Sequence, residues 1–306
     1  MATLRTLPKV RDSISFLYFE HCRIEQSAKG IAIFQEKEKY VVPCASISTL
    51  LLGPGSSITH AAIKTLTENA CTVQWVGENA LRFYANGIGS SSNTERLFHQ
   101  AQLWANPQQR LAVVRRMYQF RFQEELPAHL SLQQIRGLEG VRVRTAYSRM
   151  SKATGVEWRR RNYKQDDWDE ASPINKALST ANSCLYAVCQ AAIMSVGYSP
   201  ALGFIHTGKP LSFVYDIADL YKAETTILAA FEAVAESSDD LGRAVRKKCR
   251  EKFSSYRLMR RIITDVDQVM GFNNREPVES EAVNLLWDDQ IEWVEGGKNW
   301  SGGEPL

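Results

Sequence analysis

Apolar and polar residues alternate over short stretches in the first 85 residues, and this period of two predicts β-strands. Turn-forming pairs and triplets such as Gly53-Pro54-Gly55 and Asn86-Gly87 separate the stretches. One helix is expected among the strands, over residues 59–69, with Thr59 as its N-cap. The predicted strands cover residues 14–19, 31–34, 40–42, 47–52, 72–76 and 81–84.

The pattern changes to a period of 3.6 after a Gly- and Ser-rich stretch that is typical of a linker. The clearest of the helices that follow has an apolar stripe from Ile174 to Val196, with Ser172 as N-cap, Pro173 as first residue and Gly197 as its end. Such a stripe indicates packing in a core. The predicted helices cover residues 94–105, 107–124, 131–152, 173–196, 211–235, 239–254 and 256–270.

These patterns together predict an α+β fold with two domains. A small N-terminal β-strand-rich domain (1–86) is joined by a linker (87–93) to a larger all-α domain (94–270). Residues 271–306 lose the regular pattern, so we expect an acidic, mobile tail there. Five apolar residues of this tail could dock on another surface: Leu285, Leu286, Trp287, Ile291 and Trp293.

Composition limits the class of protein. The apolar fraction of 44% and the charged fraction of 23% are ordinary for a soluble globular chain of 306 residues. The sequence contains no run of eighteen apolar residues, so no membrane-spanning helix is predicted. Residues 1–12 lack the apolar core of a secretory signal, so we expect a cytoplasmic protein. The six cysteines form no CxxC pair and no zinc spacing, which favours buried, reduced side chains.

The net charge of +3 conceals an uneven distribution along the chain. From Arg275 onward, eight acidic residues face two basic ones, a balance of −6, so the rest of the chain carries +9. A basic body suits a polyanionic partner, although charge alone does not identify that partner.

Glu139 is the first residue that points to chemistry, because it lies between two glycines in a predicted helix, in Arg136-Gly-Leu-Glu-Gly140. Each glycine inside a helix costs about 0.5–1 kcal/mol relative to alanine, which indicates that another backbone or a ligand comes close. The alternative is an ordinary boundary glutamate paired with Arg136 or Arg142.

A histidine and two aspartates follow in the same domain. His206 precedes a Thr-Gly turn, and Asp216 and Asp219 are spaced i,i+3 in an apolar helical stretch. Like charges at this spacing destabilise a helix unless a cation binds between them, although an exposed acidic face would need no cation. One glutamate, one histidine and one or two aspartates favour a site for Mg²⁺ or Mn²⁺, and the lack of a nearby thiolate makes a zinc hydrolase the weaker interpretation.

Basic and aromatic residues indicate binding of nucleic acid. The predicted helices over 239–270 contain Arg243, Arg246 and Arg250 among nine basic residues, and Trp158-Arg-Arg-Arg161, Tyr163 and Lys164 form a second cluster. Lys and Arg neutralise phosphates, and flat side chains stack on exposed bases. Two such clusters near a candidate metal site favour DNA as the partner.

Two motifs carry a resemblance to a known family: residues 134–144 (QIRGLEGVRVR) and 203–219 (GFIHTGKPLSFVYDIAD). With them the chain resembles the universal CRISPR-associated integrase and DNA endonuclease of spacer acquisition, in its type I-E form. The similarity reaches to about residue 270 and includes the segments Gly53–Gly55, Ser57–Ala62 and Leu81–Gly87.

The resemblance implies a homodimer that works with a small ferredoxin-like partner protein. The complex would bind double-stranded DNA with frayed or branched 3′ ends and insert it at a CRISPR repeat. The metal ligands of the family fall on Glu139, His206 and Asp219, and its supporting acid falls on Asp216.

By the same resemblance, further residues fall on positions for DNA or for its reactive end: Arg82, Tyr163, Tyr186, Lys209, Tyr215, Arg243 and Arg246. The wedge tyrosine that splays the duplex end aligns with His21, and two arginines of the DNA channel align with Ser57 and Lys64. These departures leave the end-splitting device and the fragment length open.

The predicted reaction is a transesterification in which the 3′ hydroxyl of the incoming DNA attacks a phosphate of the repeat. With water in place of the hydroxyl, the same site would act as a nuclease. The competing hypothesis is a non-catalytic DNA-binding scaffold with a vestigial metal site, but no ligand type is lost from this sequence.

Overall fold

The computed structural model describes residues 16–28, 30–35, 38–47, 49–69, 71–78, 83–87, 94–161, 171–236, 239–272, 285–288 and 292–295. Contacts within the chain define two compact units, residues 1–272 and residues 273–306. The predicted linker, 87–93, lies outside the described residues except for Gly87.

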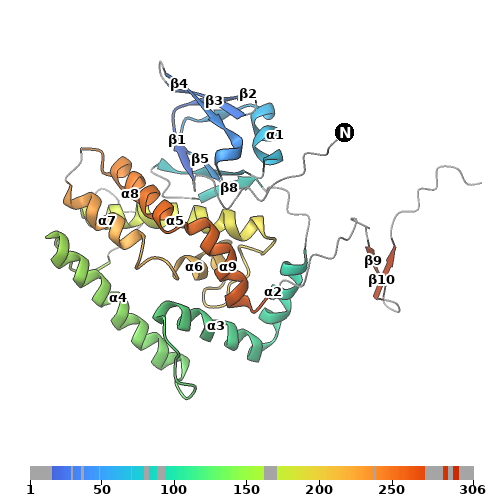
Figure 1. Cartoon of the computed structure of the whole chain (residues 1–306), viewed down its shortest axis with the longest axis vertical. Coiled ribbons are helices and arrows are strands. Elements are labelled where there is room, and N and C mark those ends of the chain that lie inside the picture. Colours follow the sequence, from blue (N-terminus) through green and yellow to red (C-terminus); the bar gives the residue numbers. More distant parts are fainter. Residues whose placement is uncertain are drawn as a thin grey trace, which may run out of the picture. The chain divides into compact units, whose positions relative to one another are not determined.

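The N-terminal part of the first unit is built from two four-stranded sheets (Figure 1). In the first, ordered β1-β5-β7-β8, the strands β1 (Leu17–Phe19), β5 (Thr49–Leu52) and β7 (Thr72–Val76) are parallel and β8 (Phe83–Gly87) is antiparallel to β7. The second sheet has the order β4-β3-β2-β6, with β4 (Glu38–Pro43), β3 (Gly30–Gln35), β2 (Arg23–Ser27) and β6 (Ser57–Ile58). A short 3-10 turn, Cys44–Ser46, follows β4.

Helix α1 (His60–Glu68) packs on β2, β3 and β7 and begins as predicted, because Oγ1 of Thr59 accepts a hydrogen bond from the amide of Ala62. The sequence pattern missed β2 and β6. β2 has one apolar residue, Ile24, which is fully buried among polar neighbours, and β6 is only two residues long. Both strands are held by pairing with neighbours rather than by their own composition.

The rest of the first unit is helical, which confirms the predicted α+β class. Its helices are α2 (Glu95–Ala105), α3 (Pro107–Phe122), α4 (Leu132–Thr154), α5 (Pro173–Ser195), α6 (Ser212–Ala218), α7 (Thr226–Ala235), α8 (Leu241–Ser255) and α9 (Leu258–Met270). Helix α5 is the centre, in contact with α6, α7, α8 and α9, while α4 lies against α3 and α7.

Helix α5 begins at Pro173, as predicted, and most of its side chains are buried. Ser172 is the N-cap residue, as predicted, but its hydroxyl makes no capping hydrogen bond and accepts one from the Asn175 side-chain amide instead. Gly197, just after the helix, has a φ of 93°, which suits glycine. By length and composition α5 could cross a membrane. However, 83% of its most apolar 18-residue stretch is buried inside the fold, as in the core helix of a globular protein.

The single helix predicted over residues 211–235 is wrong. The structure has α6 and α7 separated by turns over residues 219–225. A tertiary contact accompanies the break, since the Tyr221 hydroxyl donates to Asp265 of α9, and within the turns Asp219 pairs with Lys222. As a result Asp219 stands at the C-terminal end of α6 rather than in the middle of a helix.

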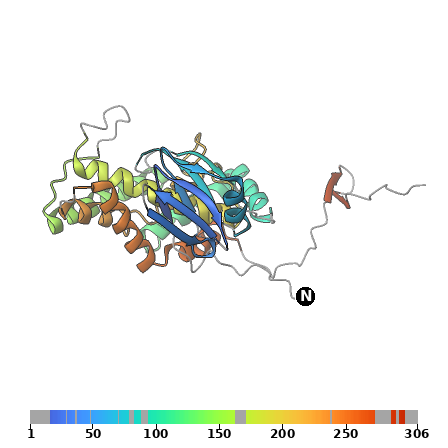
Figure 2. The same ribbon diagram turned by 90° about the horizontal axis from the view of Figure 1, so that it is seen from above.

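The sheet β1-β5-β7-β8 lies against the helices, with β5 on α5 (Figures 1 and 2). One buried apolar cluster contains most of the helical core together with Phe16, Leu51 and Val76 of the strand-rich part. The Gln74 side chain donates to the carbonyl of Ala187 across this junction. The two parts of the unit therefore share this cluster, while a second apolar cluster lies within the strand-rich part.

The six cysteines are all free and buried, as the sequence predicted. Burial raises the pKa of the Cys44 thiol to about 11, so this thiol stays protonated and unreactive at neutral pH.

In the second unit, β9 (Leu285–Asp288) and β10 (Glu292–Glu295) pair as an antiparallel hairpin. The sequence pattern gave no regular element there, so this strand pair corrects it. Ile291 lies outside the described residues, and the mobility of the tail stays a prediction.

Candidate functional site

A cavity of about 900 Å³ opens between the helices and the sheet. Its wall includes Glu139 of α4, His206 of the loop before α6, and Asp219 at the end of α6. The strand-rich part also contributes to the wall, through Gln74, Val76, Phe83 and Tyr84. The structure thus brings the three predicted metal ligands to one cavity, from segments up to 80 residues apart in sequence.

Asp216 is fully buried, and its carboxylate organises the loop that carries His206. It accepts hydrogen bonds from the backbone amides of Phe204, Ile205 and His206 at 2.6, 3.0 and 2.9 Å. Only glycine fits at position 203, because a Cβ there would lie 2.3 Å from the carbonyl oxygen of His206. The tight turn of residues 203–206 around one carboxylate therefore fixes the backbone of His206.

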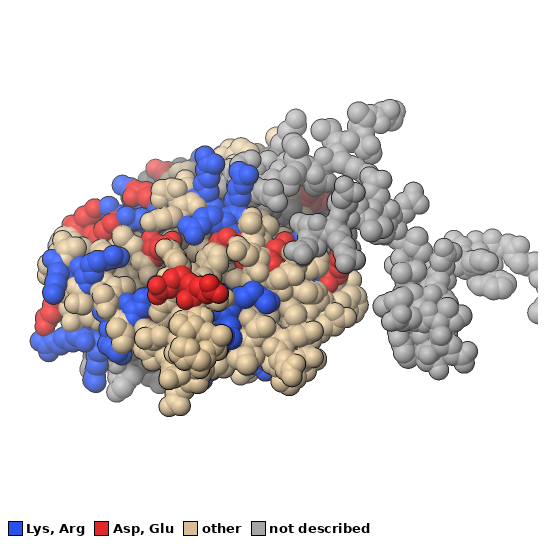
Figure 3. Space-filling model, turned by 60° about the horizontal axis from the view of Figure 1, so that its bottom comes forward, with Lys and Arg blue, Asp and Glu red and all other residues tan. Residues whose placement is uncertain are grey.

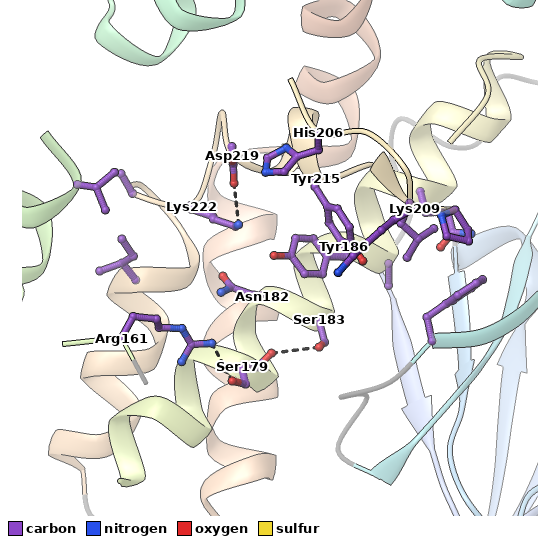
Figure 4. Close-up of a pocket in the computed structure, with 18 of the residues that line it drawn as sticks. Arg161, Ser179, Asn182, Ser183, Tyr186, His206, Lys209, Tyr215, Asp219 and Lys222 are labelled. Carbon is purple, nitrogen blue, oxygen red and sulfur yellow. Dashed lines mark hydrogen bonds and ion pairs between the residues drawn. The ribbon is translucent and has the colours of Figure 1, made fainter. Parts of the chain in front are cut away.

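The same carboxylate also holds the imidazole, since Nδ1 of His206 lies 2.7 Å from Oδ1 of Asp216. This leaves Nε2 as the ring nitrogen that can bind a ligand, and the ring points into the cavity (Figure 4). A carboxylate that orients the far nitrogen of a histidine is the usual support of a metal-binding imidazole. Asp216 thus suits the supporting role that was predicted for it.

Glu139 and Asp219 are each held by a cation of their own. Arg142 donates to both carboxylate oxygens of Glu139, at 2.9 and 3.1 Å. Lys222 lies 2.6 Å from Oδ1 of Asp219 (Figure 4). Burial alone would raise the pKa of Asp219, but Lys222 and Arg121 outweigh it and hold that pKa below its ordinary value, so the carboxylate stays ionised at neutral pH.

Arg121, on the last turn of α3, lies between these two carboxylates. Its guanidinium nitrogens are 3.6 Å from Oε1 of Glu139 and 3.4 Å from Oδ2 of Asp219. Among the residues that the structure describes, no three His, Cys, Asp or Glu side chains lie close enough, as they stand, to share a metal ion. The donor types nevertheless fit a hard divalent cation, because two carboxylates and one imidazole nitrogen line a single cavity and already have a cation between them.

Three of the predicted DNA contacts line the same cavity. Tyr186 of α5 and Tyr215 of α6 meet edge to face, with ring centroids 4.9 Å apart, and Tyr215 also lies 5.9 Å from the His206 ring. Lys209 is exposed at the wall of the cavity (Figure 4). Arg82 and Tyr163 lie outside the described residues.

The predicted contacts on α8 have different surroundings. Arg243 is exposed and Arg250 partly exposed, but Arg246 is buried, with its guanidinium 4.5 Å from the centre of the Tyr18 ring of β1. In the free chain Arg246 therefore joins the helices to the sheet. Its contact with DNA stays a prediction.

His21 is exposed in the turn between β1 and β2. Its φ of 49° is unusual for a residue other than glycine, and the conformation is held by its amide, which donates to the carbonyl of Pro54 at 2.8 Å. The ring lies over Gly55, where an added Cβ would come within 2.5 Å of Nδ1. His21 does not line the cavity that holds Glu139.

The face that carries α3 and α4 comes forward in Figure 3, and there Lys and Arg side chains stand among Asp and Glu side chains.

Gly137 in α4 has nothing within 4 Å of an added Cβ, so packing within the described part of the chain does not require this glycine. The sequence predicts that another backbone or a ligand comes close to this helix, and a binding partner would have to make that contact.

Sequence reasoning missed several polar residues of the cavity. Arg121 could have been found, because it falls on the buried stripe of α3 with Val114, Met117 and Tyr118, where a charged residue is out of place. Lys222 gave no such signal. At the far end of the cavity, Arg161 donates to Ser179, which in turn accepts from Ser183 (Figure 4).

Known proteins resemble this chain over most of its length. The model of the family described as CRISPR associated protein Cas1 matches residues 16–126 and 119–250. The CRISPR-associated endonuclease Cas1 2 of Thermus thermophilus is 49% identical over 308 residues, which cover 99% of this chain and 94% of that protein. The CRISPR-associated endonuclease Cas1 of Escherichia coli is 37% identical over 269 residues, 88% of each chain.

Solved structures agree with these matches. The crystal structure of a TtCas1–DNA complex superposes with a TM-score of 0.80 at 49% identity, covering 92% of this chain and 99% of the other. A casposase bound to its integration product has a TM-score of 0.66 at 17% identity and covers 85% of this chain and 92% of the other, which shows a shared fold.

Proposed function

The chain belongs to the family of CRISPR-associated Cas1 proteins, and on that premise we propose that it is a divalent-metal-dependent DNA endonuclease and integrase, of the type I-E form. It inserts short foreign DNA fragments into a CRISPR array. The observation that carries the proposal is the meeting of Glu139, His206 and Asp219 on one cavity beside Tyr186 and Lys209. Relatives named as endonucleases support it, as does the relative solved in complex with DNA.

In this proposal Glu139, His206 and Asp219 hold Mg²⁺ or Mn²⁺. The ion would supply positive charge to the reacting phosphate and to the oxygen that attacks it. Asp216 keeps Nε2 of His206 directed into the cavity, while Lys222 keeps the Asp219 carboxylate ionised. Lys209 and the two tyrosines offer a positive charge and flat faces to an unpaired DNA end.

The reaction exchanges one phosphodiester bond for another. The 3′ oxygen of the incoming fragment bonds to a repeat phosphorus, the bond from that phosphorus to the repeat 3′ oxygen breaks, and the proton of the attacking hydroxyl passes to solvent while the departing oxygen takes one up. No external energy source is needed, because the number of phosphodiester bonds is unchanged. When water attacks instead, the outcome is strand cleavage.

We also propose that the chain acts as a homodimer in the cytoplasm, with a small ferredoxin-like partner protein, on double-stranded DNA with frayed or branched 3′ ends and on CRISPR repeat DNA. The basic residues of α8 and the aromatic residues of the cavity are the features that suit such DNA.

One observation favours a second candidate, a DNA-binding scaffold without chemistry. Arg121 stands between the two acidic ligands, and the described side chains form no ready metal cluster. In a vestigial site, an arginine could replace the ion permanently.

Strand joining with purified components distinguishes the two candidates. The chain and its small partner are incubated with a DNA fragment that has free 3′ hydroxyls and with a plasmid that carries a CRISPR repeat, in Mg²⁺ or Mn²⁺. We expect covalent joining of the fragment to the plasmid, and none in excess EDTA. Binding of both DNAs without joining in either metal would favour the scaffold.

The two arginines on α8 are expected to behave differently. Arg243→Ala should weaken binding to unrelated DNA sequences equally and lower the salt slope of log K by about 0.9, the value for one lost phosphate contact, with unfolding unchanged within about 0.5 kcal/mol. Arg246→Ala should lower the free energy of unfolding by about 1–2 kcal/mol, because Tyr18 loses the guanidinium packed on it. Binding titrations at several salt concentrations and urea unfolding measure both, and an unchanged slope for Arg243→Ala would move the DNA path elsewhere.

A further inference from the structure

Arg121 is a buried cation at the centre of the candidate metal site. Its side chain is 4% exposed and reaches from α3 toward α4 and the end of α6. One face of the guanidinium lies 5.1 Å from the centre of the Tyr118 ring. Among the described residues it is the cation that pairs with both Glu139 and Asp219.

The guanidinium is held loosely for a buried group. Its distances to the two carboxylates, 3.6 and 3.4 Å, exceed those of a normal N–H···O hydrogen bond, and Nη2 reaches the Asp216 carbonyl only at 3.5 Å. Nε has no hydrogen-bond partner within the described part of the chain. A buried donor without a hydrogen bond costs free energy, so this arrangement leaves part of the hydrogen-bonding capacity of the Arg121 guanidinium unused.

Arg142 and Lys222 differ from Arg121 in this respect. Arg142 makes two short hydrogen bonds to Glu139, and Lys222 lies 2.6 Å from Asp219. Each of these cations can hold its own carboxylate in place without Arg121. What Arg121 adds is charge between the two carboxylates, at the position that a shared ion would take.

We propose that Arg121 is the internal counter-cation of this site: in the metal-free chain its guanidinium takes the place between Glu139 and Asp219, and a divalent ion binds by replacing those two pairings. The inference rests on the proposed metal site. Arg121 is then a positioning residue, whose positive charge offsets the repulsion between two facing carboxylates until metal and DNA arrive. It also weakens the binding of free metal ions.

Charge sets the sign of the expected effect. Arg121, Arg142 and Lys222 all face the carboxylates of Glu139 and Asp219, while the buried carboxylate of Asp216 is bound by backbone amides and His206. An incoming divalent cation is repelled by each arginine and lysine that stays close. Removing the charge of Arg121 should therefore tighten metal binding, whereas a residue that only held the ligands in position would weaken it when removed.

The test is the affinity for Mn²⁺ of the full-length chain, measured by electron paramagnetic resonance of the free ion, beside thermal unfolding with and without Mn²⁺. Arg121→Met replaces the guanidinium with an uncharged side chain. We expect Mn²⁺ to bind about tenfold more tightly or better, as the loss of one unit charge a few ångströms away implies at a partly exposed site. The metal-free melting temperature should fall, and the rise on adding Mn²⁺ should exceed that of the unchanged chain. Arg121→Gln replaces this variant if Arg121→Met does not fold.

Two control variants separate charge from packing. Arg121→Lys keeps the positive charge but loses the planar guanidinium with its several N–H donors. The Mn²⁺ affinity of this variant should stay within about threefold of that of the unchanged chain. Arg96→Met removes a partly buried arginine, one that pairs with Asp267 on α9 and does not line the cavity. It should lower the melting temperature without changing the Mn²⁺ affinity.

The possible results separate a failure of the role proposed for Arg121 from a failure of the proposed metal site. If the unchanged chain binds no Mn²⁺, or binds it equally well after His206→Ala, the metal site itself is wrong. If Mn²⁺ binding depends on His206 but is the same or weaker in Arg121→Met, Arg121 is a structural residue and the inference alone is overturned.

Discussion

Replacing His206 with alanine is expected to reduce strand joining by at least 100-fold while leaving DNA binding within about twofold of the unchanged chain. The variant removes Nε2, the nitrogen that faces the cavity, and loss of even an outer partner of a metal ligand typically costs 10–100-fold. Binding should persist because Lys209 and Arg243, the basic side chains proposed to meet the phosphates, are untouched. Joining of a 3′ hydroxyl to a repeat-bearing plasmid, measured beside a binding titration, gives both quantities.

The control is His99→Ala, which removes a histidine of α2 whose ring bonds to the carbonyl of Met270 and does not line the cavity. It should keep both joining and binding. Glu139→Ala and Asp219→Ala should fail to join as His206→Ala does, and each can bind DNA somewhat more tightly, because a carboxylate no longer repels the phosphates. Full joining by all three ligand variants would contradict the metal site and favour the scaffold.

The largest effect on folding is expected at Asp216. Asp216→Ala leaves three backbone amides of residues 204–206 without their acceptor in a buried turn, and His206 loses the partner of its Nδ1. We expect a loss of about 3–5 kcal/mol in the free energy of unfolding. Urea unfolding followed by circular dichroism measures this loss.

Asp216→Asn is the matched variant, since it has the same shape but only one acceptor oxygen and a donor where the second oxygen was. The free energy of unfolding of this variant should lie between that of the alanine variant and that of the unchanged chain. Asp240→Ala, in contrast, removes an exposed cap whose Oδ1 accepts from the amide of Arg243, and should cost about 1 kcal/mol. If Asp216→Ala unfolds no more easily than Asp240→Ala, the carboxylate does not organise the loop.

The periodicity of the sequence was enough to predict the α+β class and most helices, because those elements carry their own apolar pattern. The stripe of α5 and the cap at Thr59 are examples. The pattern failed where a distant partner decides the structure. The polar strand β2 exists by pairing with β3 and β6, and the helix predicted over 211–235 breaks where Tyr221 bonds to Asp265, 44 residues away.

The candidate site could be predicted in its ligand types but not in its cations. Glu139, His206 and Asp219 stood out as ionisable residues in apolar or glycine-rich surroundings, and the family resemblance grouped them. The spacing of Asp216 and Asp219 suggested that both carboxylates project from one side of a helix. The structure separates them, because Asp216 is enclosed by backbone amides while Asp219, beyond the last turn, reaches the cavity. That difference depends on the turn at Gly203 and on Arg121, and neither follows from local spacing.

The apolar cluster shared by the strands and the helices is expected to couple the two halves of the first unit in unfolding, although the strand-rich half also has a core of its own. Phe16, Leu51 and Val76 belong to the same core as the helices, so the helical half alone would leave part of its apolar surface uncovered. Scanning calorimetry of this unit should show one transition, and a helical half expressed by itself should aggregate. Exchange of the strand-rich half between relatives would disturb the core and, through Gln74 and Phe83, the wall of the cavity as well. Substitutions in the sheet and substitutions around Glu139 should therefore be epistatic, although they lie in different halves of the chain.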